Sequence, residues 1–171
     1  QGTHYEIYKK LGAHFCKKGK KEGVFFAVWA PNAKEVYVIG EFNDWSESAS
    51  PMERLGEGGI YATFVEDVKE GQMYKYLLVL SDGRRLYKAD PYGNYAEMRP
   101  GTASRVFDLN HFKWTDKKWM TEREKKDMNK EPMSIYECHI GSWMKHPDGT
   151  EDGFYNYREF ADRIVEYLQE M

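Results

Sequence analysis

Short apolar runs separated by turn residues occupy residues 23–109 of the chain, and this pattern constrains the fold more than any other feature of the sequence. Each run is rich in β-branched or aromatic residues and ends near Gly, Pro, Asn or Asp, as is typical of strands. The runs are Gly23–Ala30, Val36–Gly40, Ile60–Val65, Met73–Leu80 and Arg105–Phe107, and Ser81-Asp82-Gly83 has the chemistry of a hairpin turn. Short strands with turns about every 8 to 12 residues predict a mainly β protein with an immunoglobulin-like β-sandwich.

The sequence around this pattern divides the chain into four predicted parts. Residues 1–22 are expected to form an N-terminal arm, and residues 23–112 the β-sandwich. Residues 113–131 are predicted to be a linker with a short helix, because Thr115–Asn129 is highly charged and rich in helix formers. Residues 132–171 are predicted to begin a domain of a different class.

That last part has the pattern of a strand, a loop and a helix. Met133–Ile140 is strand-like. Apolar residues then recur at helical spacing over Asn156–Met171, and Asn156 with Glu159 has the spacing of a capping box. A single βα unit cannot bury both of its faces. We therefore expect residues 132–171 to be an incomplete α/β segment, the start of a larger domain.

Charge and cysteine content argue against several classes of function. The net charge is −3 with both signs mixed, which does not fit a nucleic-acid-binding surface. No apolar run approaches the ~20 residues of a membrane-spanning helix, and no signal peptide opens the chain. Cys16 and Cys138 lie far apart and indicate neither a disulfide framework nor a metal site. The sequence therefore predicts a cytoplasmic protein without cofactor or metal and without a nucleic-acid or membrane partner.

Aromatic residues make up 16% of the chain, with 13 Tyr and 5 Trp, and two of the tryptophans stand in contrasting contexts. Trp29 lies between apolar neighbours in a strand-like run and is predicted to be a core residue. Trp45 follows Asn43 and Asp44 in a turn-like stretch after the strand that ends at Gly40. Because Trp combines an apolar face with a polar edge, its place on a turn suits an amphipathic ligand such as a sugar.

Several motifs occur in the order found in bacterial glycogen branching enzymes, and the chain resembles that family from about Leu11 to its end. The motifs are Leu11-Gly12-Ala13-His14, Val28-Trp29-Ala30-Pro31-Asn32-Ala33, Gly40-Glu41-Phe42-Asn43-Asp44-Trp45, Tyr74-Lys75-Tyr76, Lys88-Ala89-Asp90-Pro91-Tyr92, Arg99-Pro100-Gly101-Thr102-Ala103-Ser104 and Met133-Ser134-Ile135-Tyr136-Glu137-Cys138-His139-Ile140-Gly141-Ser142-Trp143. The resemblance implies a β-sandwich of carbohydrate-binding module family 48. It also implies that the incomplete α/β segment is the first strand and helix of a (β/α)8 barrel of glycoside hydrolase family 13.

The resemblance implies the reaction of the whole enzyme, which cuts an α-1,4-glucan and re-attaches the piece through an α-1,6 bond in glycogen biosynthesis. Two carboxyl groups on later barrel strands perform such a retaining transfer. A barrel takes ~250 residues, so no catalytic residue is assigned in this chain, and the chain alone is predicted to form no α-1,6 linkages. Its expected partners are an α-glucan, such as glycogen or amylose, and the missing catalytic barrel of the same polypeptide.

The candidate glucan site follows from resemblance to the glycogen-binding domain of the AMP-activated kinase β subunit. Trp45 corresponds to a platform on which a glucose ring stacks, and Asn43 belongs to the same turn motif. Lys75 resembles a lysine that bonds sugar hydroxyls. A second stacking Trp of the kinase domain is replaced here by Arg84-Arg85-Leu86-Tyr87, in which Tyr87 is the candidate platform. A late sugar-binding asparagine aligns approximately with Ser104.

Other interpretations of these residues stay open. Trp45 can instead pack against the barrel, with Lys75 extended along the surface. Glu137 and His139 share a face of the predicted strand, a weak sign of acid/base or metal chemistry beside a packing role. The stretch 146–153 lacks the full ligand set of a calcium loop. The chain can also be a stand-alone glycogen- or starch-binding targeting module, or part of a debranching enzyme, and the incomplete α/β segment is expected to permit self-association.

Overall fold

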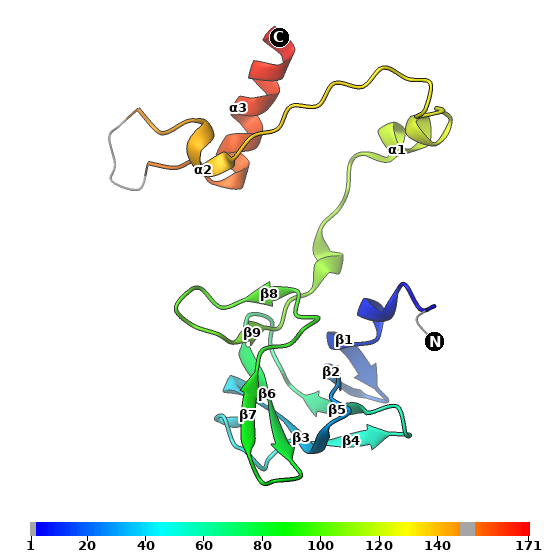
Figure 1. Ribbon diagram of the computed structural model, residues 1–171, viewed down its shortest axis with the longest axis vertical. Coiled ribbons are helices and arrows are strands. Elements are labelled where there is room, and N and C mark those ends of the chain that lie inside the picture. Colours follow the sequence, from blue (N-terminus) through cyan, green and yellow to red (C-terminus); the bar gives the residue numbers. More distant parts are fainter. Residues whose placement is uncertain (1–2, 148–152) are drawn as a thin grey trace. The chain divides into compact units, whose positions relative to one another are not determined.

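The computed structural model describes residues 3–147 and 153–171, and the chain divides into two compact units, residues up to 114 and residues from 115 onward (Figure 1). The first unit contains strands β1 (Gly12–Lys18), β2 (Lys21–Trp29), β3 (Ala33–Gly40), β4 (Pro51–Leu55), β5 (Ile60–Glu66), β6 (Met73–Leu80), β7 (Arg85–Lys88), β8 (Tyr95–Ala96) and β9 (Ser104–Arg105). Three 3-10 turns, η1 (Ile7–Lys9), η2 (Glu41–Asn43) and η3 (Leu109–His111), complete it. The mainly β class predicted from the sequence is confirmed.

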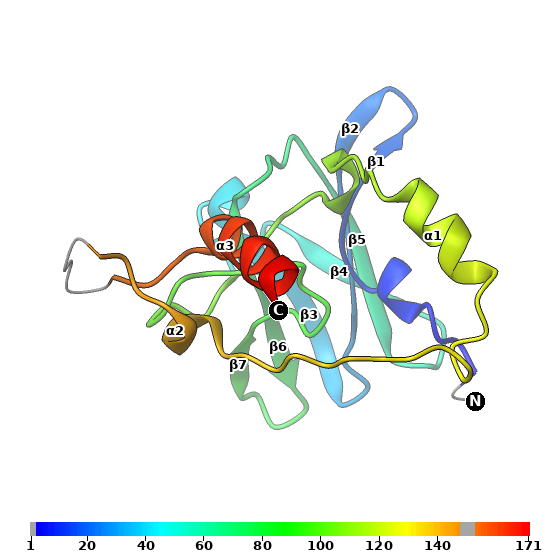
Figure 2. The same cartoon turned by 90° about the horizontal axis from the view of Figure 1, so that it is seen from above.

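The strands of the first unit pair in the order β1-β2-β5-β4-β3-β6-β9-β8, and β7 also pairs with β6. All of these pairings are antiparallel. β4 connects two layers, because Pro51 and Met52 pair with β3 whereas residues 53–55 pair with β5. Figure 2 shows β1, β2 and β5, which we term the first layer, beside β3, β6 and β7, which we term the second layer.

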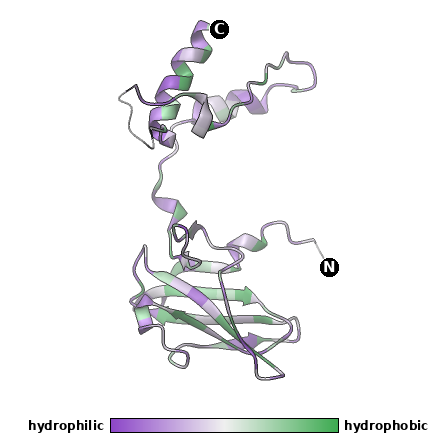
Figure 3. Cartoon of the chain, turned by 60° about the vertical axis from the view of Figure 1, so that its left-hand side comes forward, coloured by the Kyte–Doolittle hydropathy of each residue, from purple (hydrophilic) through white to green (hydrophobic). Residues whose placement is uncertain are grey.

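The hydrophobic core lies between the two layers, because side chains alternate across each strand. From the first layer, Val24, Phe26 and Val28 point inward, and from the second layer Tyr74 and Tyr76 meet them. The rings of Phe26 and Tyr74 pack edge to face with centroids 5.1 Å apart. Figure 3 shows the apolar residues concentrated on these strands. This core is the sandwich that the sequence predicts.

Asp90 is a buried carboxylate at the edge of this core. Its Oδ2 accepts hydrogen bonds from the hydroxyls of Tyr74 at 2.6 Å and Tyr76 at 3.0 Å, and its Oδ1 accepts one from the backbone N–H of Tyr92 at 2.8 Å. Burial raises the pKa of Asp90 and of both tyrosines. The three hydrogen bonds offset the cost of removing the carboxylate from water.

Two features of the first layer differ from the sequence expectations. Residues 12–18, expected in an N-terminal arm, form the edge strand β1, which pairs with β2 from Gly12 opposite Ala27 to Lys18 opposite Lys21. The prediction that Trp29 is a core residue is wrong, because this side chain is 61% exposed. Since Phe26 and Val28 face the core, the alternation of β2 turns Trp29 outward.

The second unit contains helices α1 (Lys117–Glu124), α2 (Ile140–Trp143) and α3 (Tyr157–Glu170). The predicted capping box at the start of α3 is confirmed, because the Asn156 side chain accepts from the backbone N–H of Glu159 and the Glu159 side chain accepts from that of Asn156. Residues 133–139, expected in a strand, are not part of a sheet, and α2 begins at Ile140. A parallel barrel strand is stabilised by strands on both sides, and the described part of this unit offers it no such neighbour.

Candidate functional site

The loop that follows β3 holds Trp45 in an uncommon backbone conformation. Asp44 and Trp45 both have positive φ angles, +53° and +57°. For a residue with a side chain, this left-handed region costs about 1 to 2 kcal/mol. The backbone N–H of Trp45 donates to the carbonyl of Gly40 at 2.9 Å, which keeps the turn closed. The loop therefore adopts an energetically unfavourable backbone conformation at a tryptophan whose side chain remains 38% exposed. Such backbone strain is common at functional sites.

Asn43 is the side chain that fixes this loop. Its Oδ1 accepts from the backbone N–H of Gly40 at 2.9 Å, and its Nδ2 donates to the carbonyl of Val38 and to the Ser50 hydroxyl, each at 3.0 Å. Both hydrogens of the amide are thus committed to the loop. The structure places Asn43 beneath the candidate site as a support for Trp45, rather than beside it as an open sugar contact.

Lys75 and Tyr87, the other two predicted site residues, lie together on the outer face of the second layer. The inward side chains of β6 are Tyr74 and Tyr76, so Lys75 and Leu77 lie on the opposite face of the strand, where Leu77 is nevertheless fully buried. Tyr87 of β7 pairs with Leu77 and shares that face. The Lys75 ammonium donates to the Thr102 hydroxyl at 2.7 Å, which ties β6 to the loop before β9.

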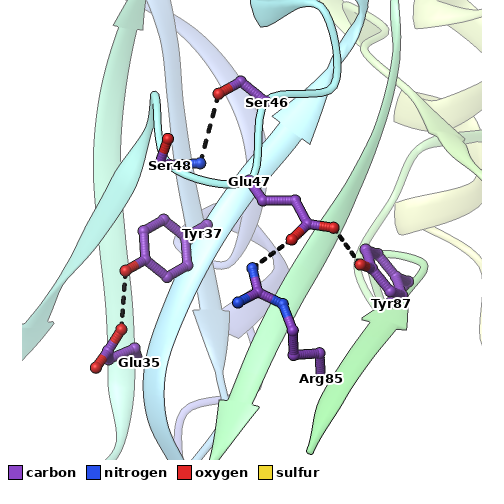
Figure 4. A network of polar contacts seen from close by, with 7 residues as sticks. All are labelled: Glu35, Tyr37, Ser46, Glu47, Ser48, Arg85 and Tyr87. Atoms are coloured by element: carbon purple, nitrogen blue, oxygen red, sulfur yellow. Dashed lines mark hydrogen bonds and ion pairs between the residues drawn. The ribbon is translucent and has the colours of Figure 1, made fainter.

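The loop that carries Trp45 reaches this outer face through Glu47 (Figure 4). The Glu47 carboxylate accepts from the Tyr87 hydroxyl and from the Arg85 guanidinium. The hydrogen bond to Glu47 raises the pKa of the Tyr87 phenol. Arg85 lies two residues before Tyr87 in β7, so both side chains face the loop. Lys75 and Tyr87 therefore lie on one face, and the loop that carries Trp45 is tied to that face through Glu47. That Trp45, Lys75 and Tyr87 form one glucan site stays a prediction.

Three further residues lie on this surface and were not predicted as site residues: Glu47, Arg85 and Tyr37. Tyr37 of β3 lies opposite Leu77, and its hydroxyl donates to Glu35 at 2.8 Å (Figure 4). Both tyrosine rings of the face thus have their hydroxyls bonded to a carboxylate. Only their positions in the sequence could have pointed to two of these residues, since Glu47 follows Trp45 by two residues and Arg85 precedes Tyr87 by two.

Ser104, the approximate counterpart of a sugar-binding asparagine, does not reach this face. It is 4% exposed and pairs with the inward residue Tyr74 across β6 and β9. Its hydroxyl accepts from the backbone N–H of Asp90 at 2.9 Å. Ser104 therefore belongs to the core around Asp90.

In the described residues of the second unit, the two candidate acid/base or metal-binding residues do not form a site. Glu137 and His139 are exposed, and Nδ1 of His139 lies 3.1 Å from the Ser142 hydroxyl. Among residues 3–147 and 153–171, no three His, Cys, Asp or Glu side chains are grouped to hold a metal ion. Most of the acidic stretch 146–153 lies outside those residues, so its weak calcium signal is not addressed by the structure.

Two findings bear on the surroundings of the protein. Within the described ranges, none of the helices is both long and apolar enough to cross a lipid bilayer. Cys16 and Cys138 are exposed free thiols.

Comparison with known proteins gives one family match and several similar enzymes. The model of the carbohydrate-binding module 48 family (isoamylase N-terminal domain) matches residues 10–93. The 1,4-alpha-glucan branching enzyme GlgB of Butyrivibrio fibrisolvens is 63% identical over 171 residues, which is 100% of this chain and 27% of the relative. The enzymes of the same name from Halothermothrix orenii and Bacillus caldolyticus are 47% and 44% identical, over 100% and 99% of this chain and 27% and 25% of the relatives. The chain thus spans about a quarter of the length of the curated relatives that it matches.

Proposed function

We propose that the first unit binds α-glucans such as glycogen and amylose on the outer face of its second layer, because residues 10–93 match the model of the carbohydrate-binding module 48 family. In this proposal the Trp45 ring stacks on a glucose unit, and the Lys75 ammonium donates to sugar hydroxyls. Tyr87 supplies a second ring, and Asn43 holds the loop in place.

The conformation of Trp45 is the observation that carries this proposal. A glucose ring has apolar C–H faces and a polar rim, so it packs well on an exposed aromatic ring whose position is already fixed. The left-handed conformation, the Gly40 bond and the Asn43 contacts fix the backbone that carries the indole before any ligand arrives. A fixed ring reduces the ordering cost of binding, which otherwise weakens contact with a flexible polysaccharide.

The chain is further proposed to be the N-terminal part of a glycogen branching enzyme. Its similarity to three branching enzymes over nearly its whole length supports this assignment over a debranching enzyme or a stand-alone targeting module. The proposed parent cleaves α-1,4-glucan and transfers the piece to form α-1,6 branches, using carboxylates outside this chain. Two exposed free thiols fit a reducing compartment, which supports the cytoplasm as its location.

Affinity electrophoresis of the purified chain in gels containing glycogen tests the binding proposal. Burying one aromatic face stabilises a complex by about 1.5 to 3 kcal/mol, so Trp45→Ala is expected to weaken binding about tenfold or more. Trp29→Ala is the matched control, because it removes an exposed tryptophan from the other layer. Equal retardation of the wild type and Trp45→Ala would contradict the proposal and favour a packing role for Trp45.

A further inference from the structure

We infer that Glu47 and Arg85 complete the glucan site: Glu47 is a positioning residue that fixes the Tyr87 ring, and Arg85 donates hydrogen bonds to sugar hydroxyls. This inference rests on the proposed function. It concerns the part of the site around Tyr87, which takes the place of the second stacking tryptophan of the kinase domain. Its evidence is the network that joins the Trp45 loop to β7 (Figure 4).

The first step concerns the orientation of Tyr87. This side chain is 49% exposed, so its ring can meet a ligand. A free phenol at the surface would turn its hydroxyl to water, but the Tyr87 hydroxyl donates to Glu47 from 40 residues away in the sequence. Because Glu47 belongs to the loop that presents Trp45, this bond couples the positions of the two rings. Glu47 thus does for Tyr87 what Asn43 does for Trp45.

The second step concerns the hydrogen-bonding capacity of the Glu47–Arg85 pair. The two side chains are 43% and 45% exposed, so both border the surface that a ligand would cover. A guanidinium has five N–H donors and a carboxylate has about four acceptor positions, and their mutual contact uses only part of each set. The pair therefore presents donors and acceptors side by side. Adjacent sugar hydroxyls, each of which donates and accepts, match that arrangement.

The third step concerns the charge of the ligand. Glu47 neutralises Arg85 within the pair, and Lys75 is the other cation that the site brings to this face. A phosphate-binding surface would leave an arginine uncompensated, since the strong contact to phosphate is the charged bidentate one. The pair accordingly favours a neutral polyhydroxyl chain over an anionic ligand.

Affinity for glycogen of Glu47→Ala, Tyr87→Phe and their double variant tests the inference. A hydrogen bond of this kind contributes about 0.5 to 1.5 kcal/mol, so each single change is expected to weaken binding about two- to tenfold. The double variant is expected to bind no worse than the weaker single variant, because both changes remove the same bond. The melting temperature should stay within a few degrees of the wild type for all three proteins.

Two further variants separate the parts of the inference. Arg85→Ala is expected to weaken glycogen binding by a similar factor. Glu47→Gln keeps an acceptor for the Tyr87 hydroxyl, so it should retain glycogen binding while the freed Arg85 increases retardation by dextran sulfate at low salt. Glu66→Ala is the control, because Glu66 forms an exposed ion pair with Lys21 in the other layer.

The outcomes distinguish this inference from the proposed function. Loss of binding in Trp45→Ala together with wild-type binding in Glu47→Ala would overturn the inference and leave the proposed function standing. Additive losses in the double variant would overturn the positioning role of Glu47. Absence of glycogen binding by the wild type would overturn both.

Discussion

The two outer faces of the sandwich differ in what holds their side chains. On the second layer, Tyr37, Lys75 and Tyr87 each end in a hydrogen bond to a named partner. On the first layer, Trp29 projects at 61% exposure from an apolar surface, anchored by an indole N–H bond to the Gly58 carbonyl at 2.9 Å. Exposure of an aromatic ring is therefore common to both faces. What separates them is the kind of partner, because the Tyr37 and Tyr87 hydroxyls donate to carboxylates, whereas the Trp29 indole donates to a backbone carbonyl.

The outer face of the first layer is apolar enough to form a small cluster of its own. Leu11, Ala27 and Ala62 are buried there, and Ile7, Phe25 and Ile60 pack against them. An antiparallel sheet usually turns one polar face to water, but here residues before β1 cover part of an apolar one. Apolar contacts thus surround Trp29 on this layer, whereas the exposed tyrosine rings of the other layer are linked to neighbouring carboxylates.

The largest expected effect extends the comparison of the two layers to the polar groups that each one places in the shared core. Asp90→Ala removes the acceptor shared by the hydroxyls of Tyr74 and Tyr76, which the second layer contributes. A buried hydroxyl left unsatisfied costs about 1 to 3 kcal/mol. Tyr74 loses its acceptor and Tyr76 keeps only a 3.5 Å contact to the Ala27 carbonyl, so the free energy of unfolding should fall by roughly 2 to 6 kcal/mol. Urea denaturation measures this change. The counterpart in the first layer is Tyr61→Phe, which removes one bond to the Ala33 carbonyl and should cost about 1 kcal/mol. Similar losses in the two variants would contradict the contrast.

Asn43→Ala tests the framework at the site itself. It leaves the Gly40 N–H and the Val38 carbonyl without their side-chain partner, so the free energy of unfolding should fall by about 1 to 3 kcal/mol, with a parallel loss of glycogen binding. Asn94→Ala is the matched control, since exposed Asn94 makes one long bond of 3.4 Å to the Phe107 carbonyl. Its cost should stay below about 0.5 kcal/mol. Wild-type stability and wild-type glycogen binding in Asn43→Ala would show that the loop does not depend on the hydrogen bonds of the Asn43 side chain.

The pH dependence of stability provides a smaller test of the same core. Burial raises the pKa of Asp90 above its ordinary value of 3.8, so the folded state retains this proton to higher pH than the unfolded state. The resulting stabilisation is fully present below pH 3.8 and is lost as pH rises through the folded-state pKa. Stability of the wild type relative to Asp90→Asn should therefore decline with rising pH. The difference between the two free energies of unfolding cancels the contributions of carboxylates present in both proteins. If this difference rose with pH, the pKa of Asp90 would be lowered on folding and the prediction would be wrong.

Local patterns in the sequence predicted strands β2, β3, β5 and β6 and helix α3 correctly because their causes are local, whereas β1 was missed. The turn chemistry of Ser81-Asp82-Gly83 marks the β6–β7 hairpin, and β6 occupies the predicted run Met73–Leu80. Trp29 was misplaced because the run Gly23–Ala30 is apolar throughout, so it does not reveal which residues face the core. The direction of its side chain depends on the packing of β2 between β1 and β5.

Only the residues of the candidate site that belong to a sequence motif could be predicted. Trp45 and Lys75 stand in recognisable motifs, and their joint role in one site stays a prediction. Glu47 acquires its role from partners 38 and 40 residues away, and no local pattern encodes such a contact. The same limit applies to residues 133–139, whose strand-like composition lacks neighbouring strands in the part of the chain that the structure describes.

The smallest effect to measure separates the two exposed tryptophans by backbone conformation alone. At position 45, where φ is +57°, Gly avoids the steric cost of the left-handed region, so Trp45→Gly should be about 1 kcal/mol more stable than Trp45→Ala. At position 29, inside β2, the order should reverse, and Trp29→Gly should be about 0.5 to 1 kcal/mol less stable than Trp29→Ala. Comparing Gly with Ala at one position cancels the lost indole contacts. The same order at both positions would mean that Trp45 is not held under strain, and the argument that its loop is built to present an aromatic ring would lose its main support.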